Sequence, residues 1–133
     1  MSLPIIGITM GDPAGVGPEV IVKALEHHSP YEVCRPLVIG DAKRLETAAG
    51  ILKLSKPIRS ISRLEEARFV QSEIECLDLA LVPEETPFGQ LSAACGEAAF
   101  RFLERAIHLA VQGGIDAICT APLNKEALHQ CRS

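Results

Sequence analysis

The sequence predicts an α/β fold in which a mainly parallel sheet is flanked by helices. Short apolar runs alternate with segments of helical periodicity along the 133 residues, and this order is typical of parallel strands joined by helical crossovers. Hydrophobic residues make up 47% of the chain and aromatic residues only 4%, with no Trp. The core must therefore rest on Ile, Leu, Val and Ala, which suits a sheet covered by helices and disfavours an all-β sandwich.

The first two strand and helix pairs lie in the N-terminal third of the chain. Residues 5–10 form a short apolar run that ends at a glycine-rich stretch, and residues 18–28 carry apolar side chains at helical spacing. Residues 37–39 predict the second strand. Asp41 follows it as a suitable N-cap for a helix over residues 42–52.

The pattern is weaker in the middle of the chain. Residues 58–61 and 74–82 predict strands, because β-branched and other apolar residues dominate them. Residues 64–69 predict one or two helical turns. The order of strand and helix continues through this region.

The last third contains the longest periodic segment. Apolar residues recur every three or four positions over residues 92–112, and Gly113-Gly114 can close this helix with a left-handed residue. Residues 115–119 then predict a buried strand, and residues 124–129 predict the start of another helix. No internal repeat is present, so a repeat architecture is excluded.

Charge and cysteine content limit the classes of partner. The chain has 13 basic and 17 acidic residues, a net charge of −4, so no basic face for nucleic acid or an anionic membrane is expected. No apolar run approaches the roughly 20 residues that cross a bilayer, and no basic segment precedes an apolar one at the N-terminus. Five cysteines without a C-x-x-C pair predict buried thiols in a reducing compartment. A cytoplasmic protein is expected.

The glycine-rich stretch is the first candidate site. It reads Gly-Asp-Pro-Ala-Gly-Val-Gly-Pro-Glu over residues 11–19 and lies beyond a predicted strand, where open parallel sheets bind their ligands. It is not a Walker loop, because it lacks the Lys and the Ser or Thr of that motif, and the third glycine of a dinucleotide fingerprint would be Val20. Tight turns and a helix N-terminus that can face a ligand remain. The residues expected to line the cleft here are Gly11, Asp12, Gly15, Gly17 and Glu19.

Two carboxylates restrict what this stretch can bind. Asp12 and Glu19 would repel an anion near the exposed N–H groups unless a cation intervenes, so they better suit polar or cationic groups. Alternatively, Asp12 caps a turn and Glu19 stabilises the helix dipole by about 0.3–1 kcal/mol. Spacing alone leaves both interpretations open.

The second candidate site spans residues 119–126, again between a predicted strand and a predicted helix. Parallel strands share one carboxyl edge, so Thr120, Asn124 and Lys125 are expected beside the glycine-rich stretch. Asn124 is a suitable N-cap, whereas the helix dipole disfavours Lys125 in the first turn by roughly 0.3–1 kcal/mol. A substrate phosphate or carboxylate would compensate, but a solvated lysine paired with Glu126 is equally open.

Neither a metal site nor a nucleophile is predicted from the residues. The four histidines lie on separate predicted elements without H-x-x-x-H spacing, so they do not form a convergent set of metal ligands. Nothing resembles a nucleophile elbow around a Ser or a Cys. We expect a structural role for each histidine, namely His27, His28, His108 and His129.

Three segments carry a family resemblance. The glycine-rich stretch, preceded by Ile-Gly-Ile-Thr-Met at residues 6–10, resembles the N-terminal signature of the 4-hydroxythreonine-4-phosphate dehydrogenase family. Residues 89–92, Gly-Gln-Leu-Ser, lead into a long helix that contains Gly96 and resemble the same family, as do residues 120–126, Thr-Ala-Pro-Leu-Asn-Lys-Glu. The resemblance covers essentially the whole chain.

The resemblance implies an NAD-dependent, metal-assisted oxidation of a phosphorylated hydroxy acid such as 4-phosphohydroxy-L-threonine. A divalent metal would polarise the alcohol and stabilise the enolate that forms on loss of CO₂. The named family member serves pyridoxal phosphate biosynthesis, and relatives oxidise threonate or erythronate 4-phosphates. The implied fold resembles isocitrate and isopropylmalate dehydrogenases, with two α/β domains, a cleft between them and a homodimer.

Family members are longer than this chain. We therefore expect residues 1–133 to be the N-terminal α/β segment of a two-domain dehydrogenase, with the rest of the fold absent. The Gly-His-Thr-Glu motif, the metal-binding histidines and most of the NAD site belong to parts of the family pattern beyond Ser133. The two loops are carried over as walls of a cleft, and no residue as a catalytic group or metal ligand.

An incomplete sheet leaves an unpaired edge and uncovered apolar surface, so we expect the segment alone to aggregate or fold loosely. We also expect it to be inactive, because metal binding needs several converging ligands that it cannot supply. The alternative function is a truncated, non-catalytic α/β module that binds a phosphorylated ligand or a protein partner.

Overall fold

A five-stranded sheet organises the chain in the computed structural model, which describes residues 2–83, 86–89 and 93–121. The strands are β1 (Ile5–Thr9), β2 (Arg35–Gly40), β3 (Ile58–Ile61), β4 (Ile74–Asp78) and β5 (Ala117–Thr120). They lie in the order β3-β4-β2-β1-β5, and each of the four neighbouring pairs is parallel. The predicted α/β class with a parallel sheet is confirmed.

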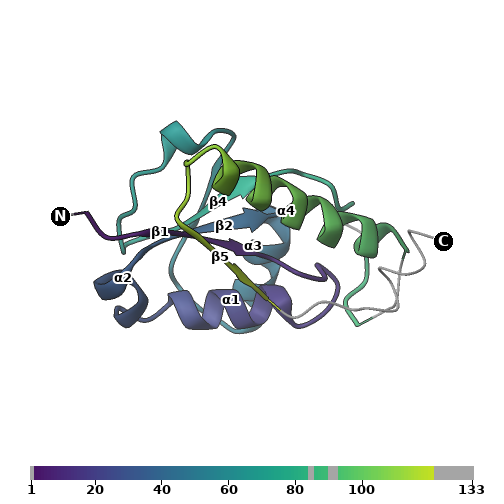
Figure 1. Ribbon diagram of the computed structural model, residues 1–133. Helices are drawn as coiled ribbons and strands as arrows, with labels where there is room; N and C mark the ends of the chain where they lie inside the picture. The colour runs from purple at the N-terminus through teal and green to yellow at the C-terminus, as the bar shows by residue number, and fades with distance from the viewer. Residues whose placement is uncertain (1, 84–85, 90–92, 122–133) are drawn as a thin grey trace.

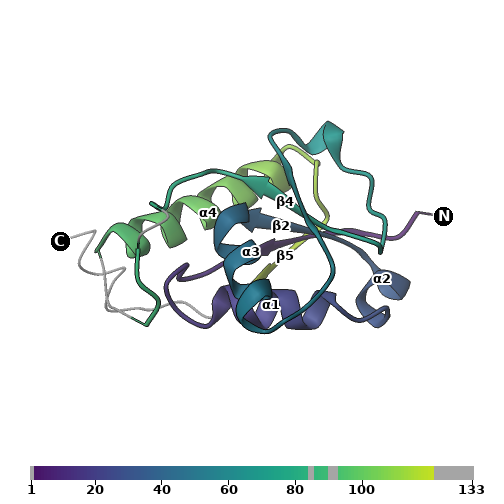
Figure 2. The same ribbon diagram turned by 180° about the vertical axis from the view of Figure 1, so that it is seen from behind.

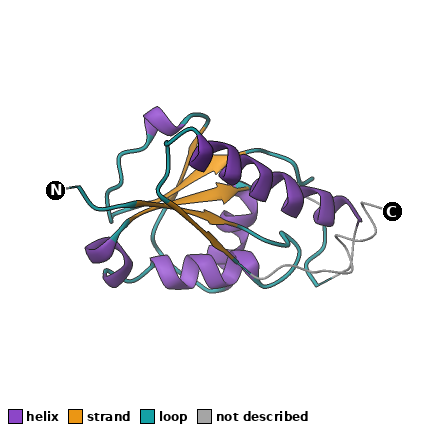
Figure 3. Cartoon of the chain, viewed as in Figure 1, coloured by secondary structure: helices purple, strands orange, loops and turns teal. Residues whose placement is uncertain are grey.

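Helices cover both faces of this sheet. α1 (Gly17–Leu25) and α3 (Ala42–Ile51) pack together on one face, and α4 (Ala93–Val111) crosses the other (Figure 1, Figure 2). Two short elements, α2 (Ser29–Val33) and η1 (Leu64–Glu66), lie in the connections between longer elements (Figure 3). None of the helices in the described part of the chain is long and apolar enough to cross a membrane.

The core consists mainly of aliphatic side chains, as the composition predicts. The central strand β2 contributes Leu37, Val38 and Ile39, and α3 contributes Leu45, all with no exposed surface. Phe102 of α4 is also fully buried, on the face of the sheet that α4 covers. After Arg35, the residues of β2 are buried on both faces, and residues 36–40 are accordingly apolar without alternation.

Two helix boundaries follow local backbone chemistry. The helix predicted over residues 18–28 ends at Leu25, and the separate helix α2 was not predicted. Pro30 lies in the first turn of α2, where its missing N–H costs nothing. At the end of α4, the predicted left-handed glycine is confirmed: Gly113 has φ 80°, and Gly114 N–H donates to the Leu109 carbonyl at 2.9 Å.

Two strand predictions are partly wrong. The strand predicted over residues 74–82 ends at Asp78, because its carboxylate accepts the Ala80 N–H at 2.9 Å and Ala80 takes a φ of 51°. The buried strand predicted over residues 115–119 corresponds to β5, which covers Ala117–Thr120. β5 lies at the edge of the sheet, and its Cys119 and Thr120 are exposed. Only one strand pairs with β5 among the described residues, so its side chains lack the cover that β2 has.

The cysteines are free thiols where the structure describes them. Cys76 and Cys95 are buried as predicted, Cys34 is half-buried and Cys119 is exposed, contrary to the prediction. Cys131 and the helix predicted over residues 124–129 lie outside the described residues.

Candidate functional site

The two predicted site segments meet at the carboxyl edge of the sheet. Thr9, the last residue of β1, is in register with Thr120, the last residue of β5. The Ala121 N–H donates to the Thr9 carbonyl at 3.0 Å, which extends the pairing beyond both strands. The glycine-rich stretch begins two residues after Thr9, so it starts beside Thr120 as the parallel topology predicts.

Asp12 shapes the glycine-rich loop from within. Its Oδ1 accepts the Ala14 N–H at 2.9 Å, and its carbonyl accepts the Gly15 N–H at 3.0 Å. The side chain is 5% exposed, and Gly11 enters the turn with φ 73°. These contacts match the interpretation in which Asp12 caps a turn.

Gly17 allows the loop to fold back onto the end of β1. A Cβ at this position would lie 2.0 Å from the Met10 carbonyl oxygen, closer than any real side chain allows. The space beside Gly17 is therefore filled by the chain's own backbone. A glycine in a dinucleotide fingerprint leaves room for a pyrophosphate instead, so this loop does not fit that role.

The N-terminus of α1 has no side-chain cap. Val16 is the N-cap residue and supplies no side-chain hydrogen bond, and Pro18 occupies the first turn. Glu19 lies in the same turn and is half-buried, where its charge is favourable to the helix dipole. The N–H groups of this turn can face a polar ligand, with Glu19 opposing a fully anionic one.

A third segment adjoins the loop and was not predicted as part of the site. The Gly89 N–H donates to the Ala14 carbonyl at 2.6 Å. Arg44 of α3 reaches the same place, with Nε donating to the Pro13 carbonyl at 3.0 Å and Nη1 to the Thr86 carbonyl at 2.7 Å. The sequence gives one sign of this contact: the charged Arg44 lies on the face of the predicted helix that also carries the buried Leu45.

The other predicted residues of the second site are not placed. Thr120 is exposed at the edge of the sheet, whereas Asn124 and Lys125 lie outside the described residues. Their predicted position beside the glycine-rich loop stays a prediction.

Metal ligands do not converge within the described part of the chain. No group of three His, Cys, Asp or Glu side chains there could hold a metal ion. His28 bonds to the Gln71 side chain at 2.6 Å, and His108 lies on α4.

Burial raises the pKa of the Cys76 thiol well above its usual value, so this thiol stays protonated and is not a nucleophile.

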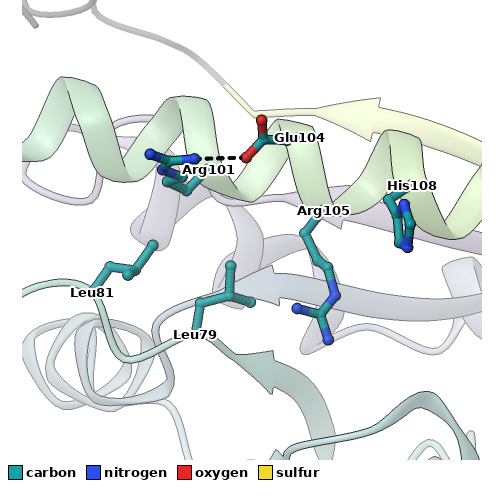
Figure 4. A pocket seen from close by; sticks show the side chains of 6 residues that line it. All are labelled: Leu79, Leu81, Arg101, Glu104, Arg105 and His108. Carbon is teal, nitrogen blue, oxygen red and sulfur yellow. Dashed lines mark hydrogen bonds and ion pairs between the residues drawn. The ribbon is translucent and has the colours of Figure 1, made fainter.

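A larger pocket lies away from the loop. It has a volume of about 490 Å³ and lies between α4 and the segment that follows β4. Figure 4 shows the Arg105 side chain among its lining residues, with Arg101 bonded to Glu104 at 2.9 Å. No residue of the glycine-rich loop lines it. The lining residues are Leu79, Leu81, Arg101, Glu104, Arg105 and His108.

A smaller apolar groove separates α1 from β5. Its volume is about 210 Å³. Val20 of α1 is 47% exposed beside it. Its lining residues are Ile8, Val20, Ile21, Ala24, Leu25, Cys119, Thr120 and Ala121.

Comparisons with known proteins agree with this fold. The family described as pyridoxal phosphate biosynthetic protein PdxA matches residues 32–133. The chain is 60% identical over 127 residues to D-threonate 4-phosphate dehydrogenase of Cupriavidus necator, covering 96% of this chain and 38% of that protein. It is 51% identical over 128 residues to a protein of Oceanobacillus iheyensis named "Putative D-threonate 4-phosphate dehydrogenase", covering 96% of this chain and 39% of that protein.

A solved structure gives the same result in three dimensions. The crystal structure of a 4-hydroxythreonine-4-phosphate dehydrogenase from Burkholderia phymatum superposes with a TM-score of 0.94 at 61% identity, over 97% of this chain and 39% of that one. This chain thus spans about two fifths of the length of the relatives it matches. The resemblance carried by the loop motifs is confirmed, and the chain belongs to the PdxA family, whose matched relatives are named as dehydrogenases.

Proposed function

We propose that residues 1–133 form the N-terminal segment of a two-domain, NAD-dependent dehydrogenase that oxidises a phosphorylated hydroxy acid. The observation that carries this proposal is the 60% identity to D-threonate 4-phosphate dehydrogenase across 96% of the chain. The glycine-rich loop and Thr120 share one sheet edge, which supports their role as walls of the cleft.

The substrate class follows from the names of the relatives. D-threonate 4-phosphate and 4-hydroxythreonine 4-phosphate both carry a phosphate at one end and an oxidisable hydroxyl nearby. We place D-threonate 4-phosphate first, because two relatives that match 96% of this chain carry that name. Oxidation of the hydroxyl on the carbon β to a carboxylate gives a β-keto acid, and such an acid can lose CO₂.

The cofactors belong outside the described residues in this proposal. The family resemblance implies a divalent metal, but the described residues contain no group of three ligands that fits one. It also implies NAD, and Gly17 packs on the Met10 carbonyl rather than leaving space for a pyrophosphate. We therefore propose that no described residue takes part in a step on the metal or on NAD, and that the metal ligands lie beyond Ser133. A cytoplasmic homodimer is part of the same proposal.

A hybrid protein tests the proposal. Residues 1–133 of this chain would replace the matching segment of the Cupriavidus necator protein, and NADH formation would be followed with D-threonate 4-phosphate. We expect turnover within about tenfold of the unmodified protein, because the walls of the cleft would be equivalent, and loss of turnover with a metal chelator. Parallel assays with 4-phosphohydroxy-L-threonine decide the substrate. A folded hybrid that turns over neither substrate would contradict the proposal.

The alternative is a non-catalytic α/β module that binds a phosphorylated ligand. The absence of a three-ligand metal group among the described residues favours it for the chain taken alone. Calorimetric titration of the 133-residue chain with D-threonate 4-phosphate tests it. Binding by the chain together with an inactive hybrid would favour the module over the enzyme.

A further inference from the structure

Arg44 is a buried charge in an unfavourable position. It is 3% exposed, and it lies in the first turn of α3, where the helix dipole disfavours a cation. None of the ion pairs found between described residues includes it. Burying a guanidinium without a carboxylate is costly, so its contacts must supply a compensating gain.

Those contacts join two loops that are distant in sequence. The guanidinium donates from Nε to the Pro13 carbonyl and from Nη1 to the Thr86 carbonyl, at 3.0 and 2.7 Å. Its Cζ lies 3.8 Å from the centre of the Phe88 ring, a stacking distance. The cation therefore bridges the glycine-rich loop and residues 86–89.

Two further bonds fix this bridge. The Gly89 N–H donates to the Ala14 carbonyl at 2.6 Å, beside the Arg44 contacts. Asp41 caps α3 and accepts the Arg44 backbone N–H at 3.2 Å, which holds the start of the side chain. The Nη2 atom of Arg44 is buried with no hydrogen-bond partner, so the guanidinium is held through Nε, Nη1 and its stacking on the Phe88 ring.

We propose that Arg44 is a positioning residue that fastens residues 86–89 onto the glycine-rich loop and so sets the wall of the cleft. A planar guanidinium can donate to two carbonyls while it stacks on a ring. A lysine at this position could donate to the two carbonyls, but its ammonium group has no plane that could stack on the Phe88 ring. The role in the cleft rests on the proposed function, whereas the fastening of the loops does not.

Hydrogen exchange tests the fastening directly in the hybrid protein, because the measurement requires a folded chain but no activity. In Arg44→Lys and Arg44→Met we expect the amides of Gly89 and Gly15 to exchange roughly tenfold faster, with the amides of β2 unchanged. Met keeps the length of the buried side chain without a charge and provides a second variant if Lys fails to fold. Equal acceleration of all amides, or none at Gly89, would overturn the proposal.

Arg59→Lys is the matched control. Arg59 is also partly buried, and its Nη1 donates to the Glu66 carbonyl and to the Glu75 carboxylate, both at 2.7 Å. Its side-chain hydrogen bonds and ion pairs with described residues involve Glu66, Glu73 and Glu75, and none of these residues belongs to the glycine-rich loop or to residues 86–89. We expect this variant to lose stability while the Gly89 amide keeps its protection relative to the amides of β2.

Kinetics of the hybrid protein test the role in the cleft. A misplaced wall should raise KM for the phosphorylated substrate roughly tenfold in Arg44→Lys, with kcat within about twofold, and Arg59→Lys should leave both unchanged. Unchanged KM together with faster Gly89 exchange would confine Arg44 to loop structure and overturn its role in the cleft. An inactive unsubstituted hybrid would contradict the proposed function alone, since the exchange measurement would still decide the fastening.

Discussion

Single residues determine the shape of the glycine-rich loop. Asp12 accepts the Ala14 N–H, and Gly17 lies against the Met10 carbonyl with no space for a Cβ. The Asp12 contact agrees with one of the two interpretations that the sequence leaves open, because Asp readily caps turns. The Gly17 contact could not be expected, since nothing in the local sequence tells which backbone atom will approach a glycine.

The first prediction concerns Gly17. Gly17→Ala should lower the free energy of unfolding by roughly 1–3 kcal/mol, because the new Cβ would displace the end of β1. Chemical denaturation monitored by circular dichroism measures this loss. Gly50→Ala is the matched control: Gly50 lies in α3 with open space around it, so the change should stabilise by about 0.5–1 kcal/mol. Equal effects of the two substitutions would contradict the close approach.

The second prediction concerns pH and Tyr31. Burial, and then the nearby Glu75 carboxylate, raise the pKa of Tyr31 from 10.0 to about 12. The unfolded chain loses this proton first, so the stabilising contribution is complete below pH 10 and is lost as the pH rises toward 12. Tyr31→Phe should remove this part of the alkaline destabilisation.

Denaturation of both proteins in reducing buffer at several pH values checks this. The difference in unfolding free energy should be constant up to about pH 9 and should then change in favour of Tyr31→Phe. A constant difference up to pH 12 would show that Tyr31 titrates normally.

At the scale of elements, caps and turns explain where helices and strands end. The Asp41 cap and the Gly113 termination follow local rules and were predicted from the sequence. The separate helix α2 and the early end of β4 were not. Both involve local contacts that form only one of several turns the same residues allow: Pro30 lies in the first turn of α2, and the Asp78 carboxylate accepts the Ala80 N–H.

The third prediction concerns the N-cap of α3. The Asp41 carboxylate accepts the N–H groups of Lys43, Arg44 and Val82, at 3.0, 3.2 and 3.2 Å. Asp41→Ala should therefore cost about 1–2 kcal/mol of unfolding free energy, measured by urea denaturation. Asp41→Asn keeps one oxygen that can accept the Lys43 and Arg44 N–H groups, whereas the Val82 N–H loses its acceptor, so this variant should lose less than Asp41→Ala. If Ala and Asn cost the same, the cap is not the source of the effect.

At the scale of the whole molecule, one edge of the sheet is incompletely covered. Cys119 and Thr120 of β5 are exposed, and the groove between α1 and β5 is lined mainly by apolar side chains. The chain spans about two fifths of the length of its matched relatives. An exposed strand edge beside apolar surface favours association between molecules.

The fourth prediction follows from that edge. The 133-residue chain should associate as its concentration rises, measured by sedimentation velocity, and Val20→Ser in the groove should reduce the association. Val111→Ser is the control, because Val111 is 81% exposed at the far end of α4 and lies outside the groove. A chain that stays monomeric at all concentrations would contradict the expected role of this edge.

Periodicity in the sequence predicts the α/β class and the order of the main elements, and the general rule that parallel strands share one carboxyl edge predicts that Thr120 lies beside the start of the glycine-rich loop. The sequence also identified the family from short loop motifs, a result that the comparisons confirm. The contacts in three dimensions were needed to show that Arg44 joins two loops and that β5 is an exposed edge. Both features depend on residues that are distant in sequence, and local patterns do not encode which partners meet. The Asp12 cap is a local contact, but the sequence allowed two roles for this side chain and the structure distinguishes them.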